Sequence, residues 1–193
     1  MHTTTGGPAN EPLQRTVLRA AAERQYRWTD ERSMADDDLK TAAETARQRL
    51  THRLWRLGDA QSWADQIILG MEKPHEWLID VSTATTTAEA RDALLKADGQ
   101  PDVNRVWSAL MSDWLRILVA DPERDSEIGK ALFDLAMAGE VPAREAAGAM
   151  YSFWDAIDLA KDGTFGTLEE ERAKLRDFLH RWSEPRRADA KAR

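Results

Sequence analysis

Two stretches of this 193-residue sequence decide its fold: residues 39–57, LKTAAETARQRLTHRLWRL, and residues 103–118, VNRVWSALMSDWLRIL. In both, apolar residues recur every three or four positions, which is the period of an α-helix with one buried face. The first stripe consists of Leu39, Ala42, Ala46, Leu50, Leu54 and Leu57, and the second of Val103, Val106, Trp107, Leu110, Trp114 and Leu118. We expect one helix in each stretch. Gly58 is expected to end the first, and Pro101 and Pro122 to bracket the second.

Helical spacing continues through the rest of the chain. One helix is expected to pass Leu135 and stop at Gly139, and another to run from Pro142 to a stop near Gly163. Thr86 with Glu89 and Thr167 with Glu170 have the spacing of capping boxes, so each pair predicts the start of a helix. Shorter helices are expected at about residues 11–26, 60–71 and 75–82.

These elements predict an all-α fold, a single-domain bundle of seven or eight helices with short loops. The helical domain is expected to span residues 11–183. Residues 1–10 are small and polar, which predicts a disordered leader, and residues 184–193 are rich in Arg, Ala and Lys, which predicts a basic disordered tail.

Composition excludes several classes of protein. The chain has no Cys, so disulfides, thiolate metal sites and Cys nucleophiles are ruled out. The first ten residues lack the apolar core of a signal peptide, and no apolar run approaches the roughly 18 residues of a membrane span. The expectation is a cytoplasmic protein without a membrane partner.

Acidic residues are concentrated in the last third of the chain. The whole chain has 27 Lys and Arg against 34 Asp and Glu, a net charge of −7, which disfavours nucleic-acid binding. Residues 121–171 hold 13 acids and 4 bases, a net charge of −9, whereas residues 172–193 hold 8 bases and 3 acids, a net charge of +5. An acidic surface of this kind favours a basic protein partner.

The carboxylates expected to meet that partner lie in three groups. Asp155, Asp158 and Asp162 are spaced by three and four residues and share one helix face. The second group is Glu169, Glu170 and Glu171, and the third, which ranks after these two, is Glu140 and Glu145. Their predicted role is to pair with Lys or Arg of the partner, and no catalytic residue is assigned.

We expect no metal site and no cofactor. A Glu-x-x-His pair on one helix is a common metal-binding arrangement in helical bundles. The one such pair, Glu72 and His75, contains Pro74, which makes a shared helical face unfavourable.

The last third also resembles the small all-α immunity proteins of bacterial toxin systems. The resemblance rests on Gly139-Glu140-Val141-Pro142, on the Ala-rich helix that leads to Trp154-Asp155, and on Thr167-Leu-Glu-Glu-Glu171. Such proteins cap or block a toxin domain, often a basic nuclease, with acidic side chains. The resemblance therefore implies a non-enzymatic inhibitor that blocks a basic toxin or effector.

Two alternatives stay open. Arg47-Gln-Arg-Leu-Thr-His52 resembles the Arg-x(4–6)-His signature of HEPN ribonucleases, which are also all-α, and this implies that Arg47 and His52 act on a scissile phosphate. With 20 Arg in the chain, one such spacing is also expected by chance. The other alternative is a helical small-ligand-binding or regulatory domain, in which Trp and Met side chains line an apolar pocket. Most of the eight Trp are expected in the core, with Trp28 and Trp55 the most exposed.

Overall fold

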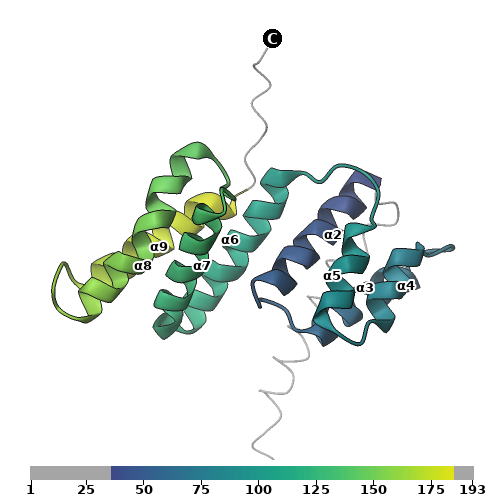
Figure 1. Ribbon diagram of the computed structural model, residues 1–193, viewed down its shortest axis with the longest axis horizontal. Helices are drawn as coiled ribbons and strands as arrows, with labels where there is room; N and C mark the ends of the chain where they lie inside the picture. The colour runs from purple at the N-terminus through teal and green to yellow at the C-terminus, as the bar shows by residue number, and fades with distance from the viewer. Residues whose placement is uncertain (1–35, 185–193) are drawn as a thin grey trace, which may run out of the picture. The chain divides into compact units, whose positions relative to one another are not determined.

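Eight α-helices make up residues 36–184, the part of the chain that the structure, a computed structural model, describes (Figure 1). They are α2 (Asp36–Thr51), α3 (Leu57–Leu69), α4 (Glu76–Thr83), α5 (Thr87–Leu95), α6 (Val103–Ala120), α7 (Asp125–Met137), α8 (Ala147–Lys161) and α9 (Leu168–Ser183). These residues contain no strand, which confirms the predicted all-α bundle. None of the eight helices combines the length and the apolar character that a membrane crossing needs. The helix expected at 11–26 and the terminal segments 1–10 and 185–193 lie outside the described residues.

The helices form two neighbouring groups, α2–α5 and α6–α9 (Figure 1). Within the second group α7 packs extensively on α8 and α6 on α9, and α2 contacts α6 across the junction of the groups. The core of the second group contains many large side chains that are almost fully buried, among them Leu110, Met111, Leu118, Ile128, Leu132, Met150, Ile157, Leu175 and Leu179. The first group has a smaller-residue core, which includes Ala43, Ala46, Ala60, Ala64, Leu78, Val81, Ala90 and Leu94.

The first predicted helix ends earlier than expected. α2 stops at Thr51, and Gly58 lies inside the first turn of α3 rather than at a helix end. The chain turns at Arg53, whose φ of 56° is left-handed, and the backbone N–H of Leu54 donates to the carbonyl of Arg49 at 2.8 Å. Because this turn is short, Leu54 still packs against the core. The apolar spacing therefore continues past the end of α2 and does not reveal that the helix stops there.

The other predicted helix ends agree more closely with the structure. Gly139 and Gly163 have φ of 76° and 69°, and they follow the ends of α7 and α8 as expected. The helix expected from Pro142 begins later, with a 3₁₀ turn at Arg144–Ala146 followed by α8.

The two expected capping boxes differ in the structure. Thr86 and Glu89 form a complete box at the start of α5, in which each side chain accepts from the other residue's backbone N–H. At the start of α9, the hydroxyl of Thr167 accepts from the backbone N–H of Glu170 at 3.3 Å, but the reciprocal bond is absent among the described contacts.

An ion pair joins α2 to α6. Arg49 Nε lies 2.6 Å from Asp113 Oδ2, and Arg116 also pairs with this carboxylate. The guanidinium of Arg49 lies 4.8 Å from the ring centre of Trp55, and His52 packs on Trp114 with ring centres 5.7 Å apart. These contacts fix the first group of helices against the second.

Candidate functional site

The end of the bundle formed by α8, its loop and α9 collects most of the predicted partner-binding carboxylates. Asp155 and Asp158 are exposed on α8, and Asp162 is exposed as its C-cap, so the three follow one helix face as expected. Glu169 and Glu170 are exposed in the first turn of α9. We call Asp158, Asp162, Glu169 and Glu170, together with the loop at 163–167, the acidic end.

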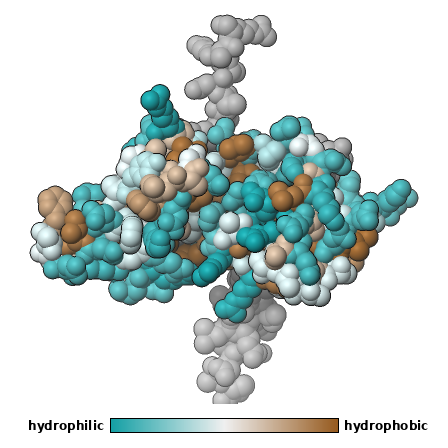
Figure 2. All heavy atoms as spheres, viewed as in Figure 1, coloured by the Kyte–Doolittle hydropathy of each residue, from teal (hydrophilic) through white to brown (hydrophobic). Residues whose placement is uncertain are grey.

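Phe165 lies in the middle of this acidic end and is 68% exposed. In Figure 1 the α8–α9 loop is at the left edge, and Figure 2 shows a few brown spheres there among teal and white ones. The sequence predicts only a helix stop and an N-cap in this segment. The signal for the exposed side chain is a Phe between two glycines in a polar turn.

The loop holds Phe165 in a defined position. The backbone N–H groups of Thr164 and Phe165 both donate to the carbonyl of Leu159, at 2.9 and 3.3 Å. Gly163 and Gly166 have φ of 69° and 68°, a conformation that residues with a Cβ rarely adopt. The loop backbone is therefore fixed, and it carries an exposed apolar side chain between acidic ones.

A buried ion network lies beneath the acidic end. Asp125, which is fully buried, accepts from Lys161 Nζ and from Arg172 Nε, both at 2.6 Å. Arg172 also pairs with Glu123 at 2.8 Å. Burial alone raises the pKa of Asp125, but the hydrogen bonds from Lys161, Arg172 and the Ser126 backbone outweigh it and lower that pKa below its usual value.

Lys and Arg side chains close to the exposed carboxylates already form ion pairs with buried ones. Lys161 and Arg172 are engaged by Asp125, and Lys174 Nζ lies 2.6 Å from Glu171 Oε1. Glu171 is only 4% exposed, so its carboxylate faces its own chain rather than a partner, unlike Glu169 and Glu170. Among the described residues, the carboxylates of Asp162 and Glu169 have neither an ion pair nor a hydrogen bond. The acidic end therefore presents uncompensated negative charge.

Two of the predicted carboxylates lie elsewhere. Glu145 precedes α8 and Asp162 follows it, and the 15 residues of this helix separate its ends by about 22 Å. Glu140 lines a groove of about 280 Å³ between α2 and α6. Arg47 lines the same groove, and its pKa is raised mainly by the hydrogen bond to Glu44, with a smaller contribution from the charge of Glu140. The eight predicted residues therefore do not form one surface.

Arg47 and His52 occupy different environments on α2. Arg47 forms a two-pronged ion pair with Glu44, at 2.6 and 2.8 Å, and Gln48 donates to the same carboxylate at 2.9 Å. His52 Nε2 lies 3.2 Å from Gln48 Oε1, and burial, followed by the charge of Arg47, lowers the pKa of His52. A phosphate approaching Arg47 would meet the carboxylate of Glu44, which is unfavourable for the HEPN-type chemistry.

The Trp side chains are mostly in the core. Trp63, Trp77, Trp107, Trp114 and Trp182 are each less than 9% exposed. Trp55 and Trp154 are half-buried, and Trp28 lies outside the described residues.

Neither a metal-binding cluster nor a similarity to known proteins identifies the function of the described residues. Within residues 36–184, no three His, Asp or Glu side chains are grouped in a way that could hold a metal ion. A scan of the chain against known protein families gave no match, and searches among curated proteins and among solved structures gave none either.

Proposed function

We propose that this chain is a protein-binding module that uses the acidic end to hold a basic protein partner. Phe165 carries this proposal, because it is a large apolar side chain kept exposed by an ordered loop. Aromatic anchors surrounded by polar residues are typical centres of protein interfaces. Because the backbone of this loop is already fixed, it loses little conformational entropy on binding, so more of the gain from burying Phe165 remains as affinity.

The charge around Phe165 supports a basic partner. Asp162, Glu169 and Glu170 lie within five residues of Phe165 along the chain, and the nearby cations Lys161 and Arg172 are engaged beneath them. Complementary charge of this kind speeds association and makes the affinity sensitive to salt. The partner's site is therefore expected to combine Lys or Arg side chains with an apolar recess for the Phe165 ring.

The resemblance to immunity proteins supports a more specific form of the proposal. In this form the partner is a toxin domain with a basic active surface, and the acidic end covers that surface. The module then inhibits by occlusion, which requires no catalytic residue of its own. The ion pair of Arg47 with Glu44 favours this function over RNA cleavage.

Site-specific photo-crosslinking in cells of the source organism tests the binding surface. The photoreactive residue p-benzoylphenylalanine replaces Phe165 in one version and, as a control, Leu69 in another. Leu69 is 86% exposed but lies on α3, in the other group of helices. The proposal expects one basic protein crosslinked from position 165 and not from position 69. Equal capture from both positions, or none from position 165, would overturn it.

Binding measurements with the captured protein test the chemistry. Phe165→Ala is expected to weaken the affinity at least about tenfold, as is usual for an interface anchor. Asp162→Asn with Glu169→Gln is expected to weaken it most at low salt. Glu72→Gln with Asp92→Asn removes the same charge from exposed positions in the first group of helices and should leave the affinity unchanged. An affinity that is independent of salt would contradict the acidic interface.

A further inference from the structure

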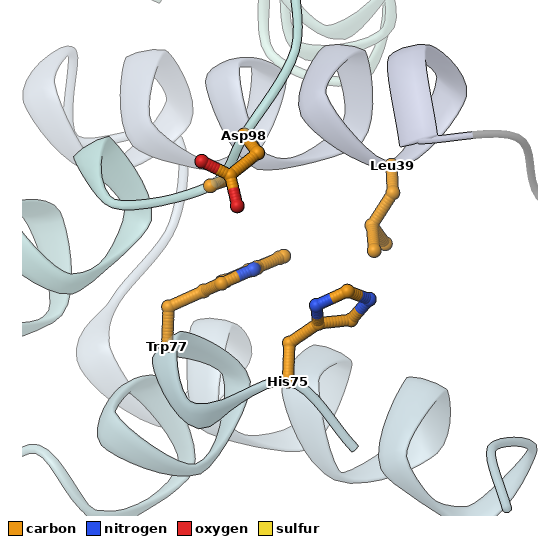
Figure 3. Close-up of a pocket in the computed structure, with 5 residues that line it drawn as sticks. Leu39, His75, Trp77 and Asp98 are labelled. Atoms are coloured by element: carbon orange, nitrogen blue, oxygen red, sulfur yellow. The ribbon is translucent and has the colours of Figure 1, made fainter. Parts of the chain in front are cut away.

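The pocket at Trp77, in the first group of helices, is too small for an organic ligand. It lies between the start of α4 and the connection from α5 to α6, measures about 60 Å³ and is lined by Leu39, His75, Trp77, Ala97 and Asp98 (Figure 3). Ligand sites usually measure about 300–1,000 Å³, and the ring of Trp77 is itself buried, at 6% exposed. A more suitable binding feature lies on the surface of the second group of helices.

This feature is a set of uncovered apolar side chains along α7 and α8. Phe133 of α7 contacts Tyr151 and Trp154 of α8, with ring centres 6.2 and 5.3 Å apart. Met137, one helical turn after Phe133, is 64% exposed, and Tyr151 is 42% exposed, so the described helices leave this side of the pair open. We call Phe133, Met137, Tyr151 and Trp154 the aromatic face. Aromatic residues and Met are the types enriched at protein interfaces.

Contacts within the chain hold the aromatic face in position. The hydroxyl of Tyr151 donates to the carbonyl of Ala136 at 2.8 Å, and Lys130 Nζ lies 5.1 Å from the ring centre of Trp154. The ring of Phe133 lies against both aromatic neighbours. The three rings therefore have defined neighbours before any partner arrives, which lowers the entropic cost of covering them.

The aromatic face continues into the carboxylates of α8. Tyr151 stands four residues before Asp155, and Trp154 four residues before Asp158, so each pair shares one side of the helix. The hydroxyl of Ser126 in α7 donates to Asp158 at 3.1 Å, which places the start of α7 beside that carboxylate. The side of α8 that carries the two rings therefore leads to the acidic end.

The charge along this side of α8 favours a basic partner. Lys130, which lies over Trp154, already pairs with Asp134 at 3.1 Å. Asp155 is exposed, and among the described residues its carboxylate has neither an ion pair nor a hydrogen bond. A partner that covers the rings is therefore attracted when it carries Lys or Arg opposite Asp155.

The acidic end alone is small for a partner site. It comprises four carboxylates and the loop at 163–167, whereas a stable complex typically covers about 20–30 residues of each partner. At about 1.5 Å per residue, Tyr151 and Asp162 are separated by about 17 Å along α8. One partner of ordinary size spans that distance, so the aromatic face supplies the contact area that the acidic end lacks.

We propose that the basic partner held by the acidic end also packs on the aromatic face, so that its interface runs from Phe165 along α8 to Met137. This inference rests on the proposed function, because it assigns a second contact to the same partner. The partner's surface is expected to present an apolar patch to the rings, bordered by Lys or Arg side chains opposite Asp155 and Asp158.

Crosslinking from position 137 tests the second contact. p-Benzoylphenylalanine replaces Met137 in one version and Leu95 in the control, since Leu95 is 57% exposed but belongs to α5 in the first group of helices. The inference expects position 137 to capture the same basic protein as position 165, and position 95 not to capture it. Capture from position 165 without capture from 137 would overturn the inference and leave the proposed function standing. No capture from position 165 would overturn the proposed function itself.

The affinity for the protein captured from position 165 measures the contribution of the aromatic face. Met137→Ser is expected to weaken binding about tenfold, and Leu95→Ser to leave it unchanged. Both positions are exposed, so both variants are expected to fold. Equal affinities of the two variants would overturn the inference. So would a dimer of the full chain, measured by analytical ultracentrifugation, that Met137→Ser dissociates and Leu95→Ser preserves, because it would assign the aromatic face to a second copy.

Discussion

Gly129 of α7 packs directly against the backbone of Trp154 in α8. A Cβ at position 129 would lie 3.2 Å from both the Cα and the backbone nitrogen of Trp154, and 3.4 Å from a methyl group of Ile157. Backbone atoms cannot rotate away as a side chain can, so the two helices approach this closely only because position 129 has no side chain. This contact sets the spacing of α7 and α8, the helices that lead into the acidic end.

Replacing Gly129 is expected to destabilise the protein although Ala favours a helix. Overpacking costs about 1–3 kcal/mol and the higher helix propensity of Ala returns about 1 kcal/mol, so Gly129→Ala should lose about 1 kcal/mol. Gly148→Ala is the matched control, because a Cβ there meets nothing within 4 Å in α8. The control should be neutral or slightly more stable. Urea unfolding measures both, and equal stability of the two variants would contradict the close contact.

The buried carboxylate of Asp125 is expected to stabilise the second group of helices. Asp125→Asn keeps the shape of the side chain but leaves Lys161 and Arg172 without their counter-charge. Breaking a buried ion pair costs about 3–5 kcal/mol, and partial exposure of the two cations places the expected loss near the lower figure. Asp155→Asn, at an exposed position of α8, should change the free energy of unfolding by less than about 0.5 kcal/mol. Urea unfolding measures the free energy of unfolding of both variants, and an equal loss in the two would contradict the stabilising role of Asp125.

Acid should weaken the fold through the same carboxylate. The folded-state pKa of Asp125 lies below its usual value of 3.8, and that of Glu44 lies below 4.5, because their hydrogen bonds outweigh burial. The unfolded chain therefore takes up protons first, so this stability is present above the usual pKa values and is lost as pH falls through the lowered ones. Unfolding free energies between pH 5 and pH 3 should fall less steeply in Asp125→Asn than in the unaltered chain. Equal slopes would show that Asp125 is not linked to acid stability.

Most of the fold was predictable because apolar spacing and helix stops are local signals. Gly139 and Gly163 end helices where the sequence placed them, since a left-handed residue after a helix strongly favours glycine. The end of α2 was missed for a related reason. Arg53 adopts the left-handed conformation without being glycine, and Leu54 kept the apolar period through the turn.

The candidate site was predictable only in part because side-chain partners are not local. The spacing of Asp155, Asp158 and Asp162 correctly placed them on one face of α8. Glu171 faces inward with Leu175 and Phe178, which its spacing of four and seven residues from them could have indicated, but the prediction grouped it with Glu169 and Glu170, which remain exposed. The pocket at Trp77 joins α4 to a segment about twenty residues later, and such a meeting depends on the fold rather than on spacing.

His52 is expected to give a second, weaker dependence of stability on pH. Burial and the nearby charge of Arg47 lower its folded-state pKa below the usual 6.5, so the unfolded chain binds this proton more readily. Stability should therefore rise as pH increases from about 5 to 7, and His52→Phe should remove this slope while keeping an aromatic ring against Trp114. Glu72→Gln, at an exposed position distant in sequence, is the control and should retain the slope. Unfolding free energies at pH 5.5 and 7.5 check this, and an unchanged slope in His52→Phe would show that another group titrates there.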